Sequence, residues 1–469
     1  MGKNGYRLYI AAMTAALLVP FAGMTFWKTD RTTENKEMSE WPSVMEDGKF
    51  NLNILEEMGT YFEDHFAFRL QMLTANAKLW TETTKTSTTD QVVAGKDDWL
   101  YYSGTVGDYT GEELLSSREM YAVVHNLSMM RDYIEAKGSR FILTIAPNKN
   151  TLYGEYMPYY YREGSQSNLD RLVPLLEEAG IEYADLKSAF EAKEEVLYFR
   201  RDSHWNNKGA CLAYNTIMDT AGRQHETYLN LPYETKKDHI GDIDEILYPL
   251  AAEEEEDVYY DKEWGYKYVN EVQDNMDPWI ETMAPGKEGS LLMYRDSFGE
   301  SLLPFFAEEY ARACFSRLVP YNMENLDYCR PDTVVVERVE RKIAAFATEI
   351  PIMESPLTEN IRPSAKTTDT VIKTEQDGAY LVIRGTVDET CIDEDTEILV
   401  AVSGQDRTEL KTYEAFYTLS TKGDGNGYQI YIKREHLPSD SIHIDVITRD
   451  GEESWITASA DKEITWKEQ

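Results

Sequence analysis

Apolar residues change their spacing along this chain, and each change predicts a different kind of structure. The first stretch is uncharged from Leu8 to Trp27 and has basic residues on both sides. A helix of about 20 apolar residues crosses a bilayer core of about 30 Å. We therefore expect residues 1–28 to form a membrane anchor, with Lys3 and Arg7 on the cytoplasmic side.

A cleaved signal peptide is the alternative to an anchor, since Pro20, Ala22 and Gly23 are compatible with a cleavage site. The apolar core of a signal peptide usually has about 7–15 residues, fewer than this stretch. In both cases most of the chain lies outside the cytoplasm. A single-pass cell-membrane protein is the primary prediction, and a secreted protein is the alternative.

Short apolar runs alternate with amphipathic segments between residues 91 and 350. The runs 140–147, 196–199, 289–294, 313–319 and 333–339 predict buried strands, and the segments 112–137, 167–179, 187–195, 210–221 and 301–310 predict helices. This alternation indicates an α/β fold with a parallel sheet and helices on both faces. Residues 225–288 are rich in charge and Tyr and show no clear period, so we expect a long insertion or lid there.

The segments on either side of this region have other patterns. Residues 29–90 predict a polar tether and an amphipathic helix over residues 52–83. Residues 351–369 are rich in Pro, Ser and Thr and predict a linker. Residues 370–469 contain only alternating strand patterns, which predict an all-β sandwich of about 100 residues. Carbohydrate binding is one role for such a module, although its sequence carries no decisive signature.

The charge of the chain narrows the choice of partners. The 469 residues include 84 acidic and 47 basic ones, for a net charge of −37. A nucleic-acid duplex requires a basic face, so we expect no nucleic-acid partner. A polyanion is repelled at long range, which favours a neutral or weakly charged substrate. The four cysteines form no CxxC pair, and we predict no disulfide framework, metal site or cofactor.

Two short motifs carry the candidate chemistry. YRDSFGES places Ser297 between a buried strand and a helix, at the edge of an α/β sheet where ligands bind and backbone N–H groups can hold an oxyanion. RRDSHWNNKG places Asp202 and His204 in a loop after the run 196–199. We expect the three side chains to reach one cleft, where His204 takes the serine proton and Asp202 orients the imidazole ring.

Each motif also has an ordinary structural interpretation. An Asp-x-His segment is often an N-cap followed by a packed histidine, and DSF is often only the start of a helix. Metal binding by Asp202 and His204 is disfavoured, because no third ligand has a natural spacing. The two motifs together, each predicted to follow its own strand at the same edge, favour catalysis.

A series of motifs in this chain resembles those of known exported bacterial proteins. In order they are ENKEMSEWP, YFEDHFAFR, VVAGKDDWLYY, APNKNTLYGEYMP, RDSHWNNKGA, GDIDEI, YRDSFGESLLP and RPDTVVVERVER, between about residues 34 and 341. The set resembles the DHHW family and the SGNH-hydrolase-like O-acetyltransferases that act on alginate and other polysaccharides. The resemblance implies an SGNH-hydrolase-like sheet and a triad of Ser297, His204 and Asp202. Residue 203 is Ser where the family name implies His, so any role of that second His is lost.

The resemblance also implies an activity and a partner. We expect an extracytoplasmic O-acetyltransferase that moves an acetyl group through a serine acyl-enzyme to a hydroxyl of a cell-surface or exported polysaccharide. Acetyl-CoA is cytosolic, and the resemblance implies a membrane-bound O-acyltransferase as the acetyl donor. An acetyl esterase with the same triad and a non-catalytic glycan-binding scaffold are the alternatives.

Further side chains are candidates for contacts with the substrate. The N–H of Ser297, the side chain of Asn148 and the guanidinium of Arg295 are candidate oxyanion donors. Tyr153 and Trp205 are candidate flat surfaces for sugar rings, and simple packing is at least as good an interpretation of both.

Overall fold

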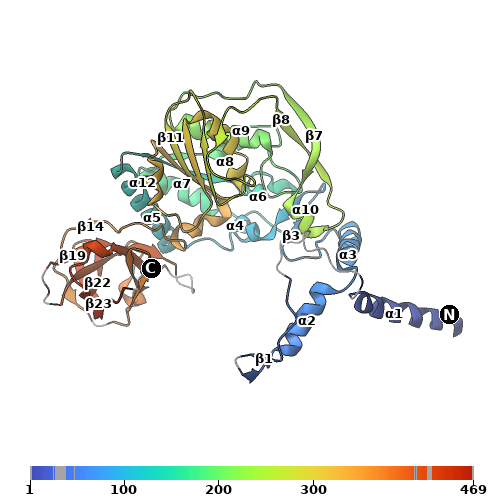
Figure 1. Ribbon diagram of the computed structural model, residues 1–469, viewed down its shortest axis with the longest axis horizontal. Coiled ribbons are helices and arrows are strands. Elements are labelled where there is room, and N and C mark those ends of the chain that lie inside the picture. The colour runs from blue at the N-terminus through green and yellow to red at the C-terminus, as the bar shows by residue number, and fades with distance from the viewer. Residues whose placement is uncertain are drawn as a thin grey trace.

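A seven-stranded mixed sheet lies at the centre of the α/β part of the molecule (Figure 1). The computed structural model describes residues 3–24, 26, 38–46, 48–366, 368–405, 407, 409–419 and 425–466. In spatial order the strands are β6 (Tyr183–Ala184), β5 (Arg140–Ala146), β13 (Thr333–Val339), β11 (Ser290–Tyr294), β12 (Arg312–Ser316), β10 (Trp279–Met283) and β9 (Lys267–Tyr268). Neighbours from β6 to β12 are parallel, whereas β10 and β9 pair antiparallel. The predicted parallel sheet is present and has an antiparallel edge.

The central strands are buried and largely apolar because both faces of the sheet are covered. In β5, Phe141 and Leu143 belong to one hydrophobic core, whereas Ile142 and Ala146 belong to another. The first core includes α5 (Ser117–Ala136) and α7 (Asn168–Glu178), and the second includes α8 (Leu186–Glu191), α9 (Asn207–Thr220) and α11 (Leu303–Glu309). Helices therefore lie on both faces, as the alternation of elements predicts.

Local sequence sets the start of the two helices in the first core. The Ser116 side chain accepts a hydrogen bond from the N–H of Glu119, whose carboxylate in turn accepts from the N–H of Ser116. Ser167 and Asp170 form the same reciprocal pair at the start of α7. These capping boxes satisfy backbone donors that a helix leaves unpaired at its first turn.

Two predicted elements differ from the structure. Residues 196–199 form no strand of the sheet, and Tyr198 makes only a single antiparallel bridge with Trp205. An apolar run of this kind also arises in a buried loop, because the loop is covered by other parts of the chain. Residues 225–288 are more regular than predicted: they contain the hairpin β7 (Tyr233–Ile240) and β8 (Glu254–Tyr260), the helix α10 (Asp242–Leu247), and β9 and β10 of the central sheet.

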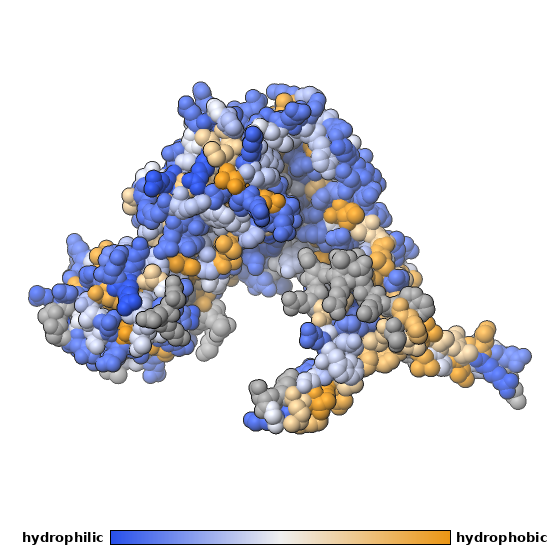
Figure 2. Space-filling view, in the orientation of Figure 1, coloured by the Kyte–Doolittle hydropathy of each residue, from blue (hydrophilic) through white to orange (hydrophobic). Residues whose placement is uncertain are grey.

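The N-terminal part forms an arm that projects from the α/β unit (Figure 1). Helix α1 (Lys3–Gly23) is long and apolar enough to cross a membrane, a property that an N-terminal signal sequence shares. Apolar residues gather along α1 in Figure 2, in contrast to the hydrophilic surface of the α/β unit. The helix predicted over residues 52–83 is divided into α2 (Ile54–His65) and α3 (Arg69–Thr84) by Phe68, which has a positive φ of 64°. The tether predicted to begin at residue 29 lies outside the described residues up to residue 37.

The C-terminal part consists of two sheets that pack face to face. One contains β14 (Leu357–Thr358), β19 (Lys411–Glu414), β18 (Glu397–Gly404), β22 (Ser441–Asp450), β23 (Glu453–Glu463) and β15 (Ser364–Ala365). The other contains β16 (Val371–Asp377), β17 (Tyr380–Thr386), β21 (Gly427–Lys433) and β20 (Phe416–Thr418). Val400 and Ile444 of the first sheet share a core with Ile383 and Ile430 of the second. Two strands, β14 and β15, come from residues predicted to be a linker.

The sandwich packs against α5, on the side of the α/β unit away from the β7–β8 hairpin (Figure 1). Asn126 of α5 donates to the carbonyls of Phe346 (2.9 Å) and Tyr417 (2.8 Å), and the ring of His125 stacks on Tyr417. The remaining short elements are β1 (Met45–Glu46), β2 (Lys49–Phe50), β3 (Val92–Ala94), β4 (Leu100–Tyr102), α4 (Val106–Thr110), α6 (Lys149–Leu152) and α12 (Asn325–Cys329).

Candidate active site

Three adjacent parallel strands bring polar side chains to one edge of the sheet. Strand β5 is followed by Asn148, β13 by Glu340 and Arg341, and β11 by Ser297. Because the strands are parallel, their carboxyl ends lie at the same edge, where ligands bind in open α/β sheets. Ser297 thus lies where its sequence predicts, between β11 and a short 3₁₀ turn, Phe298–Glu300.

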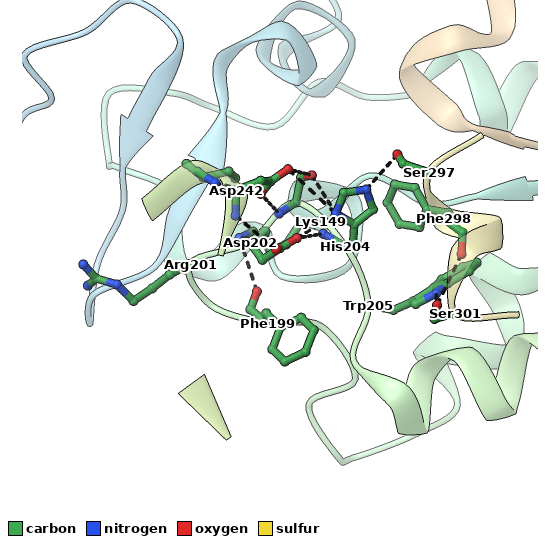
Figure 3. A network of polar contacts seen from close by, with 12 residues as sticks. Lys149, Phe199, Arg201, Asp202, His204, Trp205, Asp242, Ser297, Phe298 and Ser301 are labelled. Atoms are coloured by element: carbon green, nitrogen blue, oxygen red, sulfur yellow. Dashed lines mark hydrogen bonds and ion pairs between the residues drawn. The ribbon is translucent and has the colours of Figure 1, made fainter. Parts of the chain in front are cut away.

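The imidazole of His204 lies between Ser297 and Asp202 (Figure 3). Its Nε2 is 2.8 Å from the Oγ of Ser297, and its Nδ1 is 2.7 Å from the Oδ1 of Asp202. An ionised carboxylate can only accept, so Nδ1 carries the proton and Nε2 is left to accept from the serine hydroxyl. The structure therefore brings together the three residues that the motifs single out, in the order in which a serine nucleophile, a base and an orienting acid are arranged.

Asp202 is held by four hydrogen bonds and is only 4% exposed. Besides the imidazole, Oδ1 accepts from the backbone N–H of His204 (2.8 Å). Oδ2 accepts from Nε2 of His239 (3.0 Å) and from the backbone N–H of Asp242 (3.1 Å). These donors fix the orientation of the carboxylate, and they make Asp202 the shared acceptor of two histidines.

The side chain of Lys149 supports the loop that carries Asp202. Its ammonium group is buried and donates to the carbonyls of Phe199 (3.3 Å), Arg200 (2.9 Å) and Asp202 (2.6 Å). The loop belongs to no sheet, and this ammonium supplies donors that a neighbouring strand would otherwise provide. Burial lowers the pKa of Lys149 to about 8.

The start of α10 closes over the same loop. Gly241 approaches so tightly that a Cβ there would lie 2.4 Å from the carbonyl oxygen of Arg201. The next residue, Asp242, accepts from the N–H (2.7 Å) and the hydroxyl (2.5 Å) of Ser203. The GDIDEI motif therefore fixes the loop at a point where only glycine fits.

The charges of the three central groups depend on one another. Burial raises the pKa of Asp202, but the hydrogen bonds from His204 and His239 outweigh it and hold that pKa well below its usual value. Burial lowers the pKa of His204, but the hydrogen bond to Asp202 outweighs it and leaves the pKa above the ordinary 6.5. The pKa of His239 is raised by the same balance of burial and contact with Asp202.

Asp242 is a third potential metal ligand beside Asp202 and His204, the pair at which no metal site was predicted. The ligand atoms of Asp202, His204 and Asp242 lie within 4.8 Å of one another. The spacing in sequence gave no sign of this, because Asp242 comes from α10 and not from the same loop. Both carboxylates already accept backbone N–H groups, so hydrogen bonds within the protein account for the arrangement.

A cavity of about 680 Å³ opens beside Ser297 and His204. The β7–β8 hairpin and the segment after it supply one wall, with Ile240, Val258, Tyr259, Tyr260 and Trp264. The residues predicted to form a lid thus line this cavity. Its dimensions fall within the range of small-ligand sites.

The two predicted oxyanion side chains have different surroundings. Asn148 is buried, its Oδ1 accepts from the N–H of Arg341 (3.3 Å), and its Nδ2 has no partner within the described part of the chain. Arg295 is 1% exposed, and its guanidinium donates to the carbonyls of Asn275 and Asp296. Neither side chain lines the cavity. The backbone N–H of Ser297 has no acceptor among the residues described.

The predicted sugar-stacking residues pack inside the protein. Trp205 borders the cavity but is 2% exposed, and its Nε1–H donates to Ser301 (2.7 Å). The hydroxyl of Tyr153 accepts from the N–H of Leu197 (2.9 Å), and its ring packs on Trp99. The packing interpretation therefore describes both residues, and the accessible aromatic rings of the cavity come from the β7–β8 region.

Sequence reasoning missed three residues that contact the centre of the site. Lys149 lies in APNKN, and Asp242 in GDIDEI, two motifs noted without a role. His239 precedes the second motif and stacks on Phe199 at a centroid distance of 3.7 Å. No local pattern identifies these residues, because each acts on a loop at least 35 positions away in sequence.

Comparison with known proteins places this site in a family context. Residues 92–252 match the family model described as "SGNH hydrolase-like domain, acetyltransferase AlgX". The match confirms, over about a third of the chain, the resemblance predicted from the motifs. It includes Asn148, Asp202 and His204 and ends before Ser297.

Individual relatives are distant. The protein named "Probable alginate O-acetylase AlgJ" of Pseudomonas putida is 28% identical over 136 residues, which cover 28% of this chain and 34% of that protein. The chain spans about a third of the length of the curated relatives it matches. Similar solved structures are Bacillus cereus PatB1 (15% identity, TM-score 0.45, 54% of this chain, 96% of that chain) and a DHHW family protein from Eubacterium siraeum (15%, 0.43, 55% and 93%).

Proposed function

We propose that this protein is an extracytoplasmic O-acetyltransferase that acts through an acyl-enzyme on Ser297 and transfers the acetyl group to a hydroxyl of a polysaccharide. The observation that carries the proposal is the line of hydrogen bonds from Ser297 through His204 to Asp202 at the edge of a cavity. The family match over residues 92–252 supports acetyl transfer as the reaction class.

In the first half-reaction, the Oγ of Ser297 attacks the carbonyl carbon of the acetyl donor. The hydroxyl proton moves to Nε2 of His204, and the carboxylate of Asp202 stabilises the imidazolium that forms. When the bond to the donor oxygen breaks, His204 returns this proton to the leaving group. The products are the acetylated serine and the deacetylated donor.

In the second half-reaction, a sugar hydroxyl replaces the donor. Nε2 of His204 accepts the hydroxyl proton while the sugar oxygen attacks the acetyl carbon. The serine oxygen then leaves and takes the proton back from His204. Transfer requires that the sugar reach the acyl-enzyme before water does, and the wall formed by the β7–β8 hairpin favours this by covering one side of the site.

Each half-reaction passes through a tetrahedral oxyanion that needs hydrogen-bond donors. The unpartnered N–H of Ser297 and the buried Nδ2 of Asn148 are the two donors that we assign to this role. Loss of one oxyanion donor typically costs about 2.7–4 kcal/mol of transition-state stabilisation. Arg295 is not assigned, because its guanidinium donates to the backbone carbonyls of Asn275 and Asp296, whereas Nδ2 of Asn148 has no partner among the residues that the structure describes.

The location of the protein determines the source of its acetyl groups. With α1 in the membrane, most of the chain faces the extracytoplasmic side, where acetyl-CoA is absent. A membrane-bound O-acyltransferase that carries acetyl across the bilayer is the donor that we propose. The polysaccharide then meets the site at the membrane surface.

The experiment uses the full-length protein in detergent micelles with p-nitrophenyl acetate. We expect a burst of p-nitrophenol and an acetyl adduct on Ser297 by intact mass and peptide mapping. Ser297→Ala and His204→Ala should both lose the adduct, whereas Ser301→Ala keeps it, because Ser301 contacts Trp205 and not His204. An adduct that persists in Ser297→Ala would refute the proposal.

Addition of a glycan acceptor distinguishes transfer from hydrolysis. A transferase gives an acetylated sugar together with faster breakdown of the acyl-enzyme. Release of acetate alone, at a rate that no sugar changes, would instead identify an esterase with the same three residues.

A further inference from the structure

The cavity beside Ser297 is lined by one sign of charge. Five carboxylates border it, from Asp202, Asp242, Glu245, Asp257 and Glu300. Within the described part of the chain, no lysine or arginine is among its lining residues. Its two histidines both contact Asp202 and therefore offset a carboxylate that is already present.

Two of the five carboxylates are free to act on a ligand. Asp257 accepts from the backbone N–H groups of Asn207 (3.0 Å) and Val258 (2.7 Å), and Asp202 and Asp242 hold the catalytic loop. Glu245 is exposed and Glu300 is half-buried, and neither carboxylate accepts a hydrogen bond or forms an ion pair among the described residues. Glu300 lies three residues after the proposed nucleophile, so its charge is close to the reacting group.

The cations near the site reduce the negative potential at Glu300 from outside the cavity lining. The ammonium group of Lys149 donates to three backbone carbonyls, and the guanidinium of Arg295 donates to two. Arg201 pairs with buried Asp244. None of these side chains is available to bind a carboxylate of a sugar ring.

Two further arginines lie close to the site but outside the cavity lining. Arg317 donates to the carbonyl of Met276 (2.8 Å), and Arg341 lies over the rings of Tyr102 and Phe298. They reduce the negative potential at Glu300 and His204 without presenting a binding group inside the cavity.

The walls of the cavity suit a sugar. Tyr259, Tyr260 and Trp264 are half-buried and line the same cavity as the free carboxylates. Aromatic walls with a few polar groups are typical of small-ligand sites, and carboxylates accept hydrogen bonds from hydroxyl and ammonium groups.

From these observations we infer that the acceptor is a glycan without carboxylates, either neutral or carrying protonated amino groups, and that a uronate polymer such as alginate is a poor acceptor. This inference rests on the proposed function. A uronate would place its negative charge next to Glu245 and Glu300 with no cation to pair with, whereas an amino sugar would gain an ion pair there. The specificity would then differ from that stated in the names of the curated relatives.

The test compares three tetrasaccharides of the same length with the full-length protein acetylated by p-nitrophenyl acetate. They are cellotetraose (neutral), glucosamine tetramer (cationic) and tetramannuronate (anionic). We expect kcat/KM for the first two to exceed that for tetramannuronate by at least tenfold at low ionic strength, and the gap to narrow in high salt, because salt screens exposed charges. Inhibition of the burst by each sugar gives the same ranking if transfer is slow.

Variants connect the ranking to the two glutamates. In Glu245→Gln/Glu300→Gln the ratio of kcat/KM for the neutral sugar to that for the anionic sugar should fall at least threefold. Because the result is a ratio, a general loss of activity does not affect it. The matched control is Glu254→Gln/Glu256→Gln, which removes the same charge from exposed positions of β8 outside the cavity lining and should leave the ratio unchanged.

The outcomes separate the inference from the proposed function. Equal or better use of tetramannuronate, or no competition by any of the sugars, would overturn the inference while an adduct on Ser297 still stands. Absence of the adduct itself would remove the proposed function and the inference with it.

Discussion

Replacing Asp202 by Asn removes the charge that faces His204 and keeps the size of the side chain. In the structure Oδ1 is 2.7 Å from Nδ1, and the carboxylate is 4% exposed. The negative charge therefore stabilises the imidazolium that forms when Ser297 loses its proton. Two unit charges about 4 Å apart interact by about 4 kcal/mol at an effective dielectric constant of about 20. We expect Asp202→Asn to lower the rate of acylation about 10³-fold.

The same substitution changes the pH dependence of acylation. In the wild type, Asp202 holds the pKa of His204 above 6.5 in spite of burial. In Asp202→Asn burial remains and the charge is gone, so the pKa of His204 falls. The acid limb of the rate profile should move to lower pH while the plateau drops.

Rapid mixing with p-nitrophenyl acetate between about pH 5 and 9, followed by intact mass, measures both effects. The matched control is Asp242→Asn, because Oδ2 of Asp242 is 3.7 Å from the same Nδ1 but this side chain is 45% exposed. Solvent screening should keep the control within tenfold of the wild type. The reasoning is refuted if Asp202→Asn acylates within threefold of the wild-type rate, or if Asp242→Asn loses as much rate and shifts the limb as far.

Three further predictions follow from the same site. The rate of acylation of the wild-type protein should rise with pH with a midpoint above 6.5, because His204 must be neutral to accept the serine proton and its pKa is raised. A midpoint below 6.5 in the pH profile of the burst rate would contradict this prediction. Lys149→Met should lower the free energy of unfolding by about 2–4 kcal/mol, since three carbonyls lose their donor and removal of the buried charge offsets only part of this loss. Urea denaturation measures the change, and a variant as stable as the wild type would show that other contacts hold the loop. Trp205→Phe should lower the free energy of unfolding by about 0.5–1.5 kcal/mol in the same assay, and adding Ser301→Ala should lower it little further. Fully additive losses in the double variant would rule out coupling through the 2.7 Å hydrogen bond between the two side chains.

The strands that were predicted well are those covered on both faces. Strand β13 spans the predicted residues 333–339, because its valines alternate between two cores and every position of the strand is buried, including Glu337 and Arg338. The run 196–199 is also apolar but lies in a loop. The carbonyl of Phe199 accepts from Lys149, which is 50 positions away, and a local pattern cannot show such a partner.

The site could be predicted as far as its motifs are local. Asp202 and His204 are two positions apart, and an Asp that accepts from the N–H of the second residue after it is a short-range turn. Ser297 is marked by its place after a buried strand. His239 and Asp242 could not be assigned, because their contacts depend on how α10 closes over the loop, and sequence shows only the glycine that permits this approach.

Under the proposed function, the arm formed by α1 would affect how a polymer is modified. Phe21 of α1 packs on Phe62 at 4.4 Å, and the carbonyl of Pro20 accepts from the N–H of Ala67, so the helix is attached to α2 and α3 by contacts as well as by the chain. With α1 in the bilayer, the site stays within a limited distance of the membrane surface. A growing glycan would pass through this zone once as it leaves the cell. The number of acetyl groups per chain then depends on the ratio of turnover to export rate. At a constant amount of enzyme, a glycan exported twice as fast would carry about half as many.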